Sequence, residues 1–171
     1  MTVRSSHDTT HIVGPDDGEG LWFNGAHVTI LVPGAWNDEA FSLAEVRMPQ
    51  GRATGLHTDA SDETFRVLEG ELRFHIDGSD HRVVAGTTVT VRSGVPHAFI
   101  AVSDVARFLV LNTPGTHDRF FRGAGFPAAD RDFANAPPPD HERTVAAAKE
   151  VGVELLGPPP FPAGSVRLMS G

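Results

Sequence analysis

Short apolar segments separated by turn residues fill the middle of this chain of 171 residues, and they constrain its fold more than any other feature. The expected strands cover residues 63–68, 71–76, 82–84, 87–91, 97–102 and 106–111. Many short strands at this spacing, with no helical pattern between them, are typical of antiparallel sandwiches and barrels. An all-β fold is therefore expected. Asn24-Gly25, between two apolar runs, predicts a hairpin, because both residues of such a turn need positive φ.

The composition of the chain predicts one domain with two flanking segments. They are a flexible lead-in at residues 1–18, a strand domain at residues 19–115 and an extension rich in Ala, Pro and Gly at residues 116–171. In the extension, Asp140 and Gly152 are placed to cap a helix near residues 141–151. A proline-rich stretch follows that helix and is expected to be stiff.

Composition also excludes several classes of function. The chain has no cysteine, which excludes disulfide scaffolds, thiolate zinc sites, iron–sulfur clusters and cysteine nucleophiles. Its net charge of −8 argues against a nucleic acid or an anionic membrane as a partner. No apolar run at the N-terminus fits a signal peptide, and no stretch is apolar enough to span a membrane. Together with the lack of cysteine, this predicts a cytoplasmic protein.

Strand parity directs two polar side chains into the apolar interior. Residues two apart on a strand face the same way, so Glu63 shares a side with Phe65 and Val67. By the same rule His97 shares a side with Phe99. If these apolar residues face the core, the two polar residues face it too. A carboxylate in that position is costly unless it is paired or bound to a metal.

His57 and Asp59 complete a candidate metal site, since they project together if their segment is extended. With Glu63 and His97 they would supply two imidazoles and two carboxylates, which suit iron, manganese, cobalt, nickel, copper or zinc. The residues expected to line an adjoining substrate pocket are Phe65, Val67, Val91 and Phe99. The remaining histidines, among them His7, His117 and His141, are interpreted as solvated or structurally satisfied.

Around these residues the chain resembles the cupin superfamily. Its first motif, G-x5-H-x-H-x3,4-E-x6-G, appears as Gly51-x5-His57-x-Asp59-x3-Glu63-x6-Gly70, with Asp59 in place of the second histidine. Its second motif, G-x5-P-x-G-x2-H-x3-N, appears as Gly86-x5-Arg92-x-Gly94-x2-His97-x3-Ala101, with Arg92 and Ala101 in place of the Pro and the Asn. Flanking segments such as Leu21-Trp22-Phe23 look like those of small single-domain cupins related to bacterial quercetin 2,3-dioxygenases.

The resemblance implies a jelly-roll barrel, also called a double-stranded β-helix, that forms a homodimer. It implies one divalent transition metal, bound at the motif positions His57, Glu63 and His97. Asp59 leaves three alternatives: a fourth ligand through oxygen, a member of a facial triad of two histidines and one carboxylate, or a loss of metal binding.

The leading interpretation of function is a quercetinase-like, metal-dependent dioxygenase. Its substrates would be dioxygen and an aromatic or enolic small molecule, with Glu63 as a base whose pKa is raised by desolvation. One alternative is a cupin isomerase, epimerase, cyclase or lyase that uses the metal as a Lewis acid. The other is a non-enzymatic module that binds a small molecule.

Overall fold

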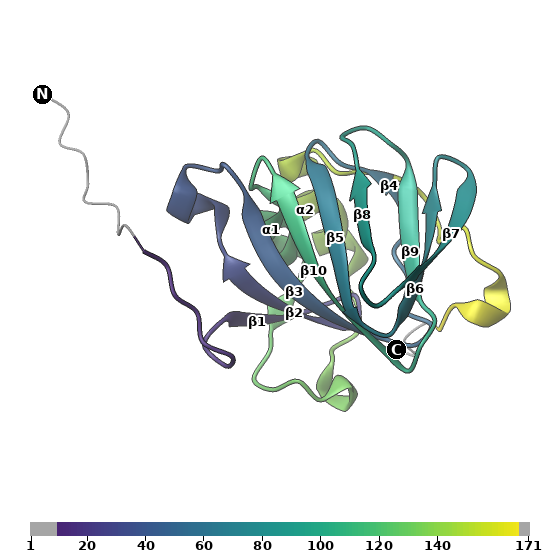
Figure 1. Cartoon of the computed structure of the whole chain (residues 1–171), viewed down its shortest axis with the longest axis horizontal. Helices are drawn as coiled ribbons and strands as arrows, with labels where there is room; N and C mark the ends of the chain where they lie inside the picture. The colour runs from purple at the N-terminus through teal and green to yellow at the C-terminus, as the bar shows by residue number, and fades with distance from the viewer. Residues whose placement is uncertain (1–9, 168–171) are drawn as a thin grey trace, which may run out of the picture.

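Two antiparallel β-sheets face each other in the computed structural model, which describes residues 10–167 (Figure 1). The larger sheet contains β1 (Glu19–Phe23), β2 (Ala26–Val32), β3 (Ser42–Pro49), β5 (Asp62–Glu69), β8 (Thr88–Val91), β10 (Val105–Thr113) and β11 (Phe126–Pro127). The smaller sheet contains β4 (Leu56–Thr58), β6 (Glu71–Ile76), β7 (Ser79–Val84), β9 (His97–Ala101) and β12 (Glu154–Gly157). The strand orders are β11-β1-β2-β3-β10-β5-β8 and β12-β4-β9-β6-β7. The expected all-β jelly roll is confirmed, as two sheets rather than a closed barrel.

The apolar core lies between the two sheets. Buried and partly exposed residues alternate along β3 and β10, which is the pattern of strands with one face on the core. Phenylalanines from both sheets meet there: Phe65 lies edge-on to Phe74 and Phe99, with ring centroids 5.1 and 5.4 Å apart. Such edge-to-face pairs add to the stabilisation that comes from buried apolar area. The well-packed core therefore fixes the strands that carry the polar side chains at its edge.

The hairpin predicted at Asn24-Gly25 joins β1 to β2. Asn24 has a φ of 49° and Gly25 a φ of 75°, and Phe23 pairs with Ala26 directly across the turn. Positive φ at both central residues is what a two-residue hairpin turn requires, which is why Asn and Gly occupy these positions.

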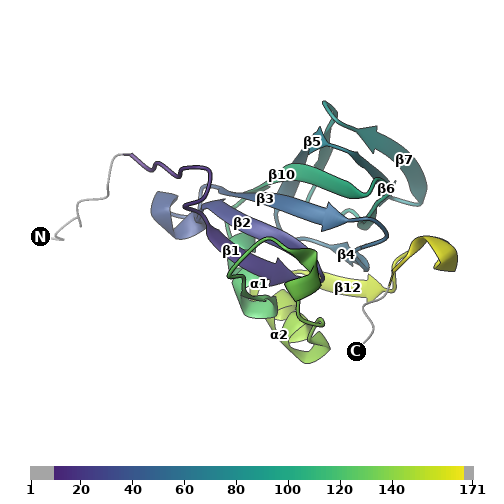
Figure 2. The same cartoon turned by 90° about the horizontal axis from the view of Figure 1, so that it is seen from below.

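The C-terminal extension adds two helices and two short strands. Helix α2 (His141–Val151) is found where it is predicted: the Asp140 side chain accepts a hydrogen bond from the Arg143 backbone N–H, and Gly152 ends the helix in the left-handed conformation. Helix α1 (His117–Ala124) and the strands β11 and β12 were not predicted. The two helices lie side by side next to β1, as Figure 2 shows. Short 3-10 helices occupy Gly34–Asn37, Phe133–Asn135 and Ala163–Ser165.

The ends of the chain are described in part. Residues 1–9, which include His7, and residues 168–171 lie outside the described residues. Of the lead-in predicted at residues 1–18, residues 10–18 are described, and they are mostly exposed with a turn at 15–17. Within residues 10–167, no helix has the length and apolar character needed to cross a membrane.

Candidate metal centre

The four residues proposed as metal ligands converge at one end of the space between the sheets. His57 lies on β4, Asp59 directly after it, Glu63 at the start of β5 and His97 at the start of β9. Each offers a ligand atom, and these atoms all lie within 4.8 Å of one another. Asp59, Glu63 and His97 are buried, and the His57 side chain is 12% exposed. His57 and His97 are direct partners across the β4–β9 pairing, which brings the two motifs together.

Both imidazoles are oriented by the backbone of their own segments. His57 Nδ1 lies 2.8 Å from the carbonyl oxygen of Gly55, and His97 Nδ1 lies 3.0 Å from that of Val95. A carbonyl oxygen only accepts, so each Nδ1 carries a hydrogen and donates it. In the neutral ring the lone pair is then on Nε2, the nitrogen that faces the cluster. This arrangement is typical of histidines that bind metals.

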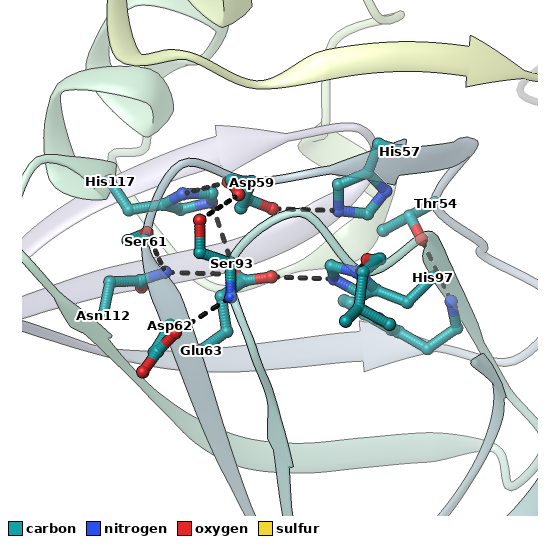
Figure 3. Close-up of polar contacts among 12 residues, drawn as sticks. Thr54, His57, Asp59, Ser61, Asp62, Glu63, Ser93, His97, Asn112 and His117 are labelled. Atoms are coloured by element: carbon teal, nitrogen blue, oxygen red, sulfur yellow. Dashed lines mark hydrogen bonds and ion pairs between the residues drawn. The ribbon is translucent and has the colours of Figure 1, made fainter. Parts of the chain in front are cut away.

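Each carboxylate has one oxygen near a hydrogen-bond donor and the other near an imidazole (Figure 3). Asn112 Nδ2 donates to Glu63 Oε1 at 3.1 Å, while Glu63 Oε2 lies 2.7 Å from His97 Nε2. Similarly, His117 Nδ1 lies 3.2 Å from Asp59 Oδ1, while Asp59 Oδ2 lies 3.4 Å from His57 Nε2. One oxygen of each carboxylate is thereby turned toward the centre of the cluster.

The chemistry of this centre fits a cation. Asp59 Oδ2, Glu63 Oε2 and His97 Nε2 are buried and have no geometrically sound hydrogen bond. The lone pair of a neutral His97 at 2.7 Å from a carboxylate oxygen would be repulsive, so a proton or a metal ion must lie between these atoms. Imidazole nitrogen and carboxylate oxygen are ligands that divalent transition metals accept.

Without a metal, the pKa values of the histidines and of Glu63 in the cluster are shifted in different directions. Burial lowers the pKa of His57, and the neighbouring His97 lowers it further. Burial also acts to lower the pKa of His97, but the hydrogen bond and charge of Glu63 outweigh it and raise that pKa. In the same way burial acts to raise the pKa of Glu63, but His97 and the charges of the other imidazoles hold it below its usual range.

The predicted direction of the Glu63 pKa shift is therefore wrong. Desolvation is the largest single influence on this pKa, as expected, but the imidazoles around Glu63 reverse the outcome. The carboxyl group with the raised pKa is Asp59, because burial and the charge of Glu63 both disfavour its ionised form.

A large cavity of about 1220 Å³ adjoins the cluster and reaches His57, Glu63 and His117. Phe65 and Phe99 line it, as predicted. The predicted lining residues Val67 and Val91 do not. They are buried in the core instead, Val67 further along β5 from the cluster and Val91 on the neighbouring β8.

The sequence interpretation also missed residues that border this cavity. His117, the first residue of α1, was interpreted as solvated or satisfied but is 6% exposed and lies beside Asp59. Phe120, Phe121 and Ala124 recur at helical spacing after it, so an apolar helix face was a usable signal. His141, at the start of α2, lines the cavity too, together with other residues of the segment 139–159.

The fold and the buried cluster define a β-sandwich protein with a candidate metal centre between its sheets. A family model described as a cupin domain matches residues 44–112. An oxalate-binding protein from Thermotoga maritima is 31% identical over 99 residues, which cover 57% of this chain and 80% of that protein. The chain belongs to the cupin superfamily.

Two further relatives show how far the similarity extends. The transcriptional regulator PuuR of Escherichia coli, of the helix-turn-helix type, is 29% identical over 107 residues, which cover 61% of this chain. The match spans 57% of the regulator's length. An RmlC-like cupin from Shewanella frigidimarina has a similar fold, with a TM-score of 0.57 and 17% identity, covering 66% of this chain and 97% of that one.

Substitution of Asp59 tests whether it binds the metal. We expect Asp59→Ala to weaken metal binding by more than about 100-fold, because loss of a ligand exceeds the 10–100-fold cost of losing a residue that supports one. We expect Asp59→His, which recreates the usual cupin motif, to restore or tighten binding. Metal affinity is measured by competition with a chelator. Full occupancy in Asp59→Ala would mean that three residues suffice to hold the metal.

Proposed function

We propose that this chain is a metal-dependent enzyme and that it catalyses the dioxygenation of an aromatic or enolic small molecule. The observation that carries the proposal is the close approach of His97 Nε2 and Glu63 Oε2 at 2.7 Å, beside a large apolar cavity. A cation would relieve this contact, and the cavity would bring a substrate to it. Two histidines and a carboxylate are the ligand set of many non-haem iron oxygenases.

The residues that would hold the metal are His57, Asp59, Glu63 and His97. When bound, the ion supplies Lewis acidity toward a substrate oxygen and, if it is redox-active, electron exchange with dioxygen. The two imidazoles keep their Nε2 lone pairs available, because their Nδ1 hydrogens are donated to backbone carbonyls. Asn112 and His117 limit the rotation of the two carboxylates. The chain thus arranges its ligands before any ion arrives.

Glu63 is the residue that we propose accepts a proton from the substrate. It borders the cavity, whereas Asp59 is not among the residues that line it. The imidazoles around Glu63 lower its pKa and so keep it ionised, which a proton acceptor must be. Its Oε2 has no sound hydrogen bond within the described residues, and this oxygen can receive a proton if it leaves the metal or binds it only loosely.

The walls of the cavity favour an apolar, ring-containing substrate. Phenylalanines from both sheets and from α1 line it, among them Phe23, Phe65, Phe99, Phe108, Phe120 and Phe121. Aromatic faces and edges stabilise a ring through edge-to-face contacts and exclude water from it. Exclusion of water also strengthens the electrostatic interactions at the cluster.

Two other functions are proposed as alternatives to the dioxygenase. A Lewis-acid isomerase, cyclase or lyase would use the same residues without consuming dioxygen. A non-enzymatic binding module is favoured by the names of two relatives, since one is an oxalate-binding protein and the other a transcriptional regulator.

Elemental analysis and an oxygen electrode separate these alternatives. We expect purified protein to hold about one divalent transition metal per chain. We also expect metal-loaded protein to consume dioxygen when flavonols or simple catechols are added. This oxygen uptake should stop when a chelator removes the metal. Conversion of a substrate without oxygen uptake would favour the Lewis-acid enzyme. Protein that binds a flavonol without converting it would favour the binding module.

A further inference from the structure

We propose that His117 is a positioning residue that orients Asp59 toward the metal, and that the two residues together replace the second histidine of the cupin motif. The inference rests on the metal site of the proposed function, but not on the reaction. It assigns a role to a residue outside both motifs and outside the region 44–112 that matches the cupin domain.

The two histidine ligands are held by their own segments of backbone. His57 and His97 each donate from Nδ1 to a backbone carbonyl two residues upstream, so their own segments orient them. An ionised aspartate has no hydrogen to donate and cannot use this device. Asp59 therefore needs a donor from elsewhere in the fold to hold its carboxylate.

His117 supplies that donor. Its Nδ1 lies 3.2 Å from Asp59 Oδ1, which is within ion-pairing distance. The other oxygen, Oδ2, lies 3.4 Å from His57 Nε2 and has no hydrogen-bond partner. With Oδ1 held by His117, Oδ2 is turned toward the centre where the imidazole nitrogens converge. One oxygen of the Asp59 carboxylate, Oδ1, is thus held by His117, and the other, Oδ2, is available to bind a metal.

Helix α1 holds the His117 ring in place. The ring lies edge-on to Phe121 and Phe120, with centroids 4.9 and 5.2 Å away, and 8% of the side chain is exposed. A ring packed in this way has little rotational freedom, so it can restrain the group it bonds to. Glu63 has a parallel support: Asn112, on β10, donates to its Oε1 and leaves Oε2 for the centre.

The test compares two substitutions of the same shape at residue 117. Asparagine places its amide nitrogen where His117 has Nδ1, whereas leucine has the same branching and no donor. With Co²⁺ as the probe and a competing chelator, we expect His117→Leu to weaken binding by about 10–100-fold and His117→Asn by less than about threefold. The visible absorption of bound Co²⁺ reports any change in its ligands. Equal affinities for the two variants would overturn the proposal.

A second background separates positioning from general damage to the fold. In Asp59→His the carboxylate is gone, so we expect His117→Leu to cost less than about threefold there. An equal loss in both backgrounds would mean that His117 acts through the fold or through Glu63, whose Oε1 lies 4.0 Å from His117 Nε2, rather than through Asp59. His27→Leu is the matched control, because His27 is also buried but lies on β2 and does not line the cavity.

The outcomes also separate this inference from the proposed function. Wild-type protein that binds Co²⁺, with His117→Leu binding it equally well, would remove the role of His117 and leave the enzyme proposal intact. Wild-type protein that binds no Co²⁺ or other divalent transition metal would overturn both.

Discussion

A variant with both His57→Ala and His97→Ala is expected to bind less than about 0.1 metal ion per chain, against about one in the wild type, because two of the four candidate ligands are gone. Elemental analysis of protein reloaded with metal measures this directly. Stability is a second measurement. A metal at 100 times its Kd stabilises the folded wild type by about 2.7 kcal/mol, so added metal should raise the Tm of the wild type and leave that of the variant unchanged.

Two histidines outside the cluster provide the control for this double variant. His75 and His81 lie on the β6–β7 hairpin and do not belong to the group of residues that could hold the metal, so His75→Ala with His81→Ala should keep the full metal content. Chemical unfolding of the metal-free proteins separates loss of ligands from loss of fold, since His97→Ala also deprives buried Glu63 of its partner. A double variant at His57 and His97 that folds and holds a full complement of metal would place the metal elsewhere.

Glu63→Gln is expected to keep most of its metal and to lose about 10²–10⁴-fold in turnover, the usual cost of removing a general base. Glutamine has the size of glutamate and keeps one oxygen, which can take the place of Oε2 as a metal ligand. His57, Asp59 and His97 remain to hold the ion. The amide cannot usefully accept a proton, and it is cheaper to bury than an unpaired carboxylate, so the fold should persist.

Metal content and turnover of the same sample decide the role of Glu63. Glu45→Gln is the matched control, because Glu45 lies on β3, is ion-paired with Arg107 and does not line the cavity. It should change neither quantity. If Glu63→Gln keeps both its metal and a near-normal rate, Glu63 is not the base. Asp59, whose pKa is raised, or water would then be the acceptor, and Lewis-acid chemistry would become the better proposal.

Local signals account for what the sequence predicts correctly. The Asn24-Gly25 turn, the alternation along the strands and the caps of α2 depend on a few neighbouring residues, and all three are found. The site shows the same rule. Glu63 and His97 can be placed by strand parity, and the cupin motifs add His57 and Asp59. Strand parity determines which face of the sheet a side chain points to, and this does not depend on distant parts of the chain.

Features that arise from distant segments could not be predicted. All six strands from β5 to β10 lie between Asp59 and His117 along the chain, and the packing of α1 brings the two residues together. The lowered pKa of Glu63 depends on three imidazoles from β4, β9 and α1. Val67 and Phe65 have the same parity on β5, yet only Phe65 lines the cavity. Parity distinguishes the two faces of a strand but not the depth along it.

The placement of the cavity wall has a consequence for evolution and for protein engineering. Residues of the segment 139–159 form much of this wall, while the metal-binding candidates all lie between residues 57 and 97. The segment joins the smaller sheet through backbone pairing of β12 with β4. Its side chains, such as those of Val145, Lys149 and Leu156, can therefore be exchanged without replacing a ligand. A library confined to this one stretch of chain would vary what the cavity admits while the metal chemistry stays the same.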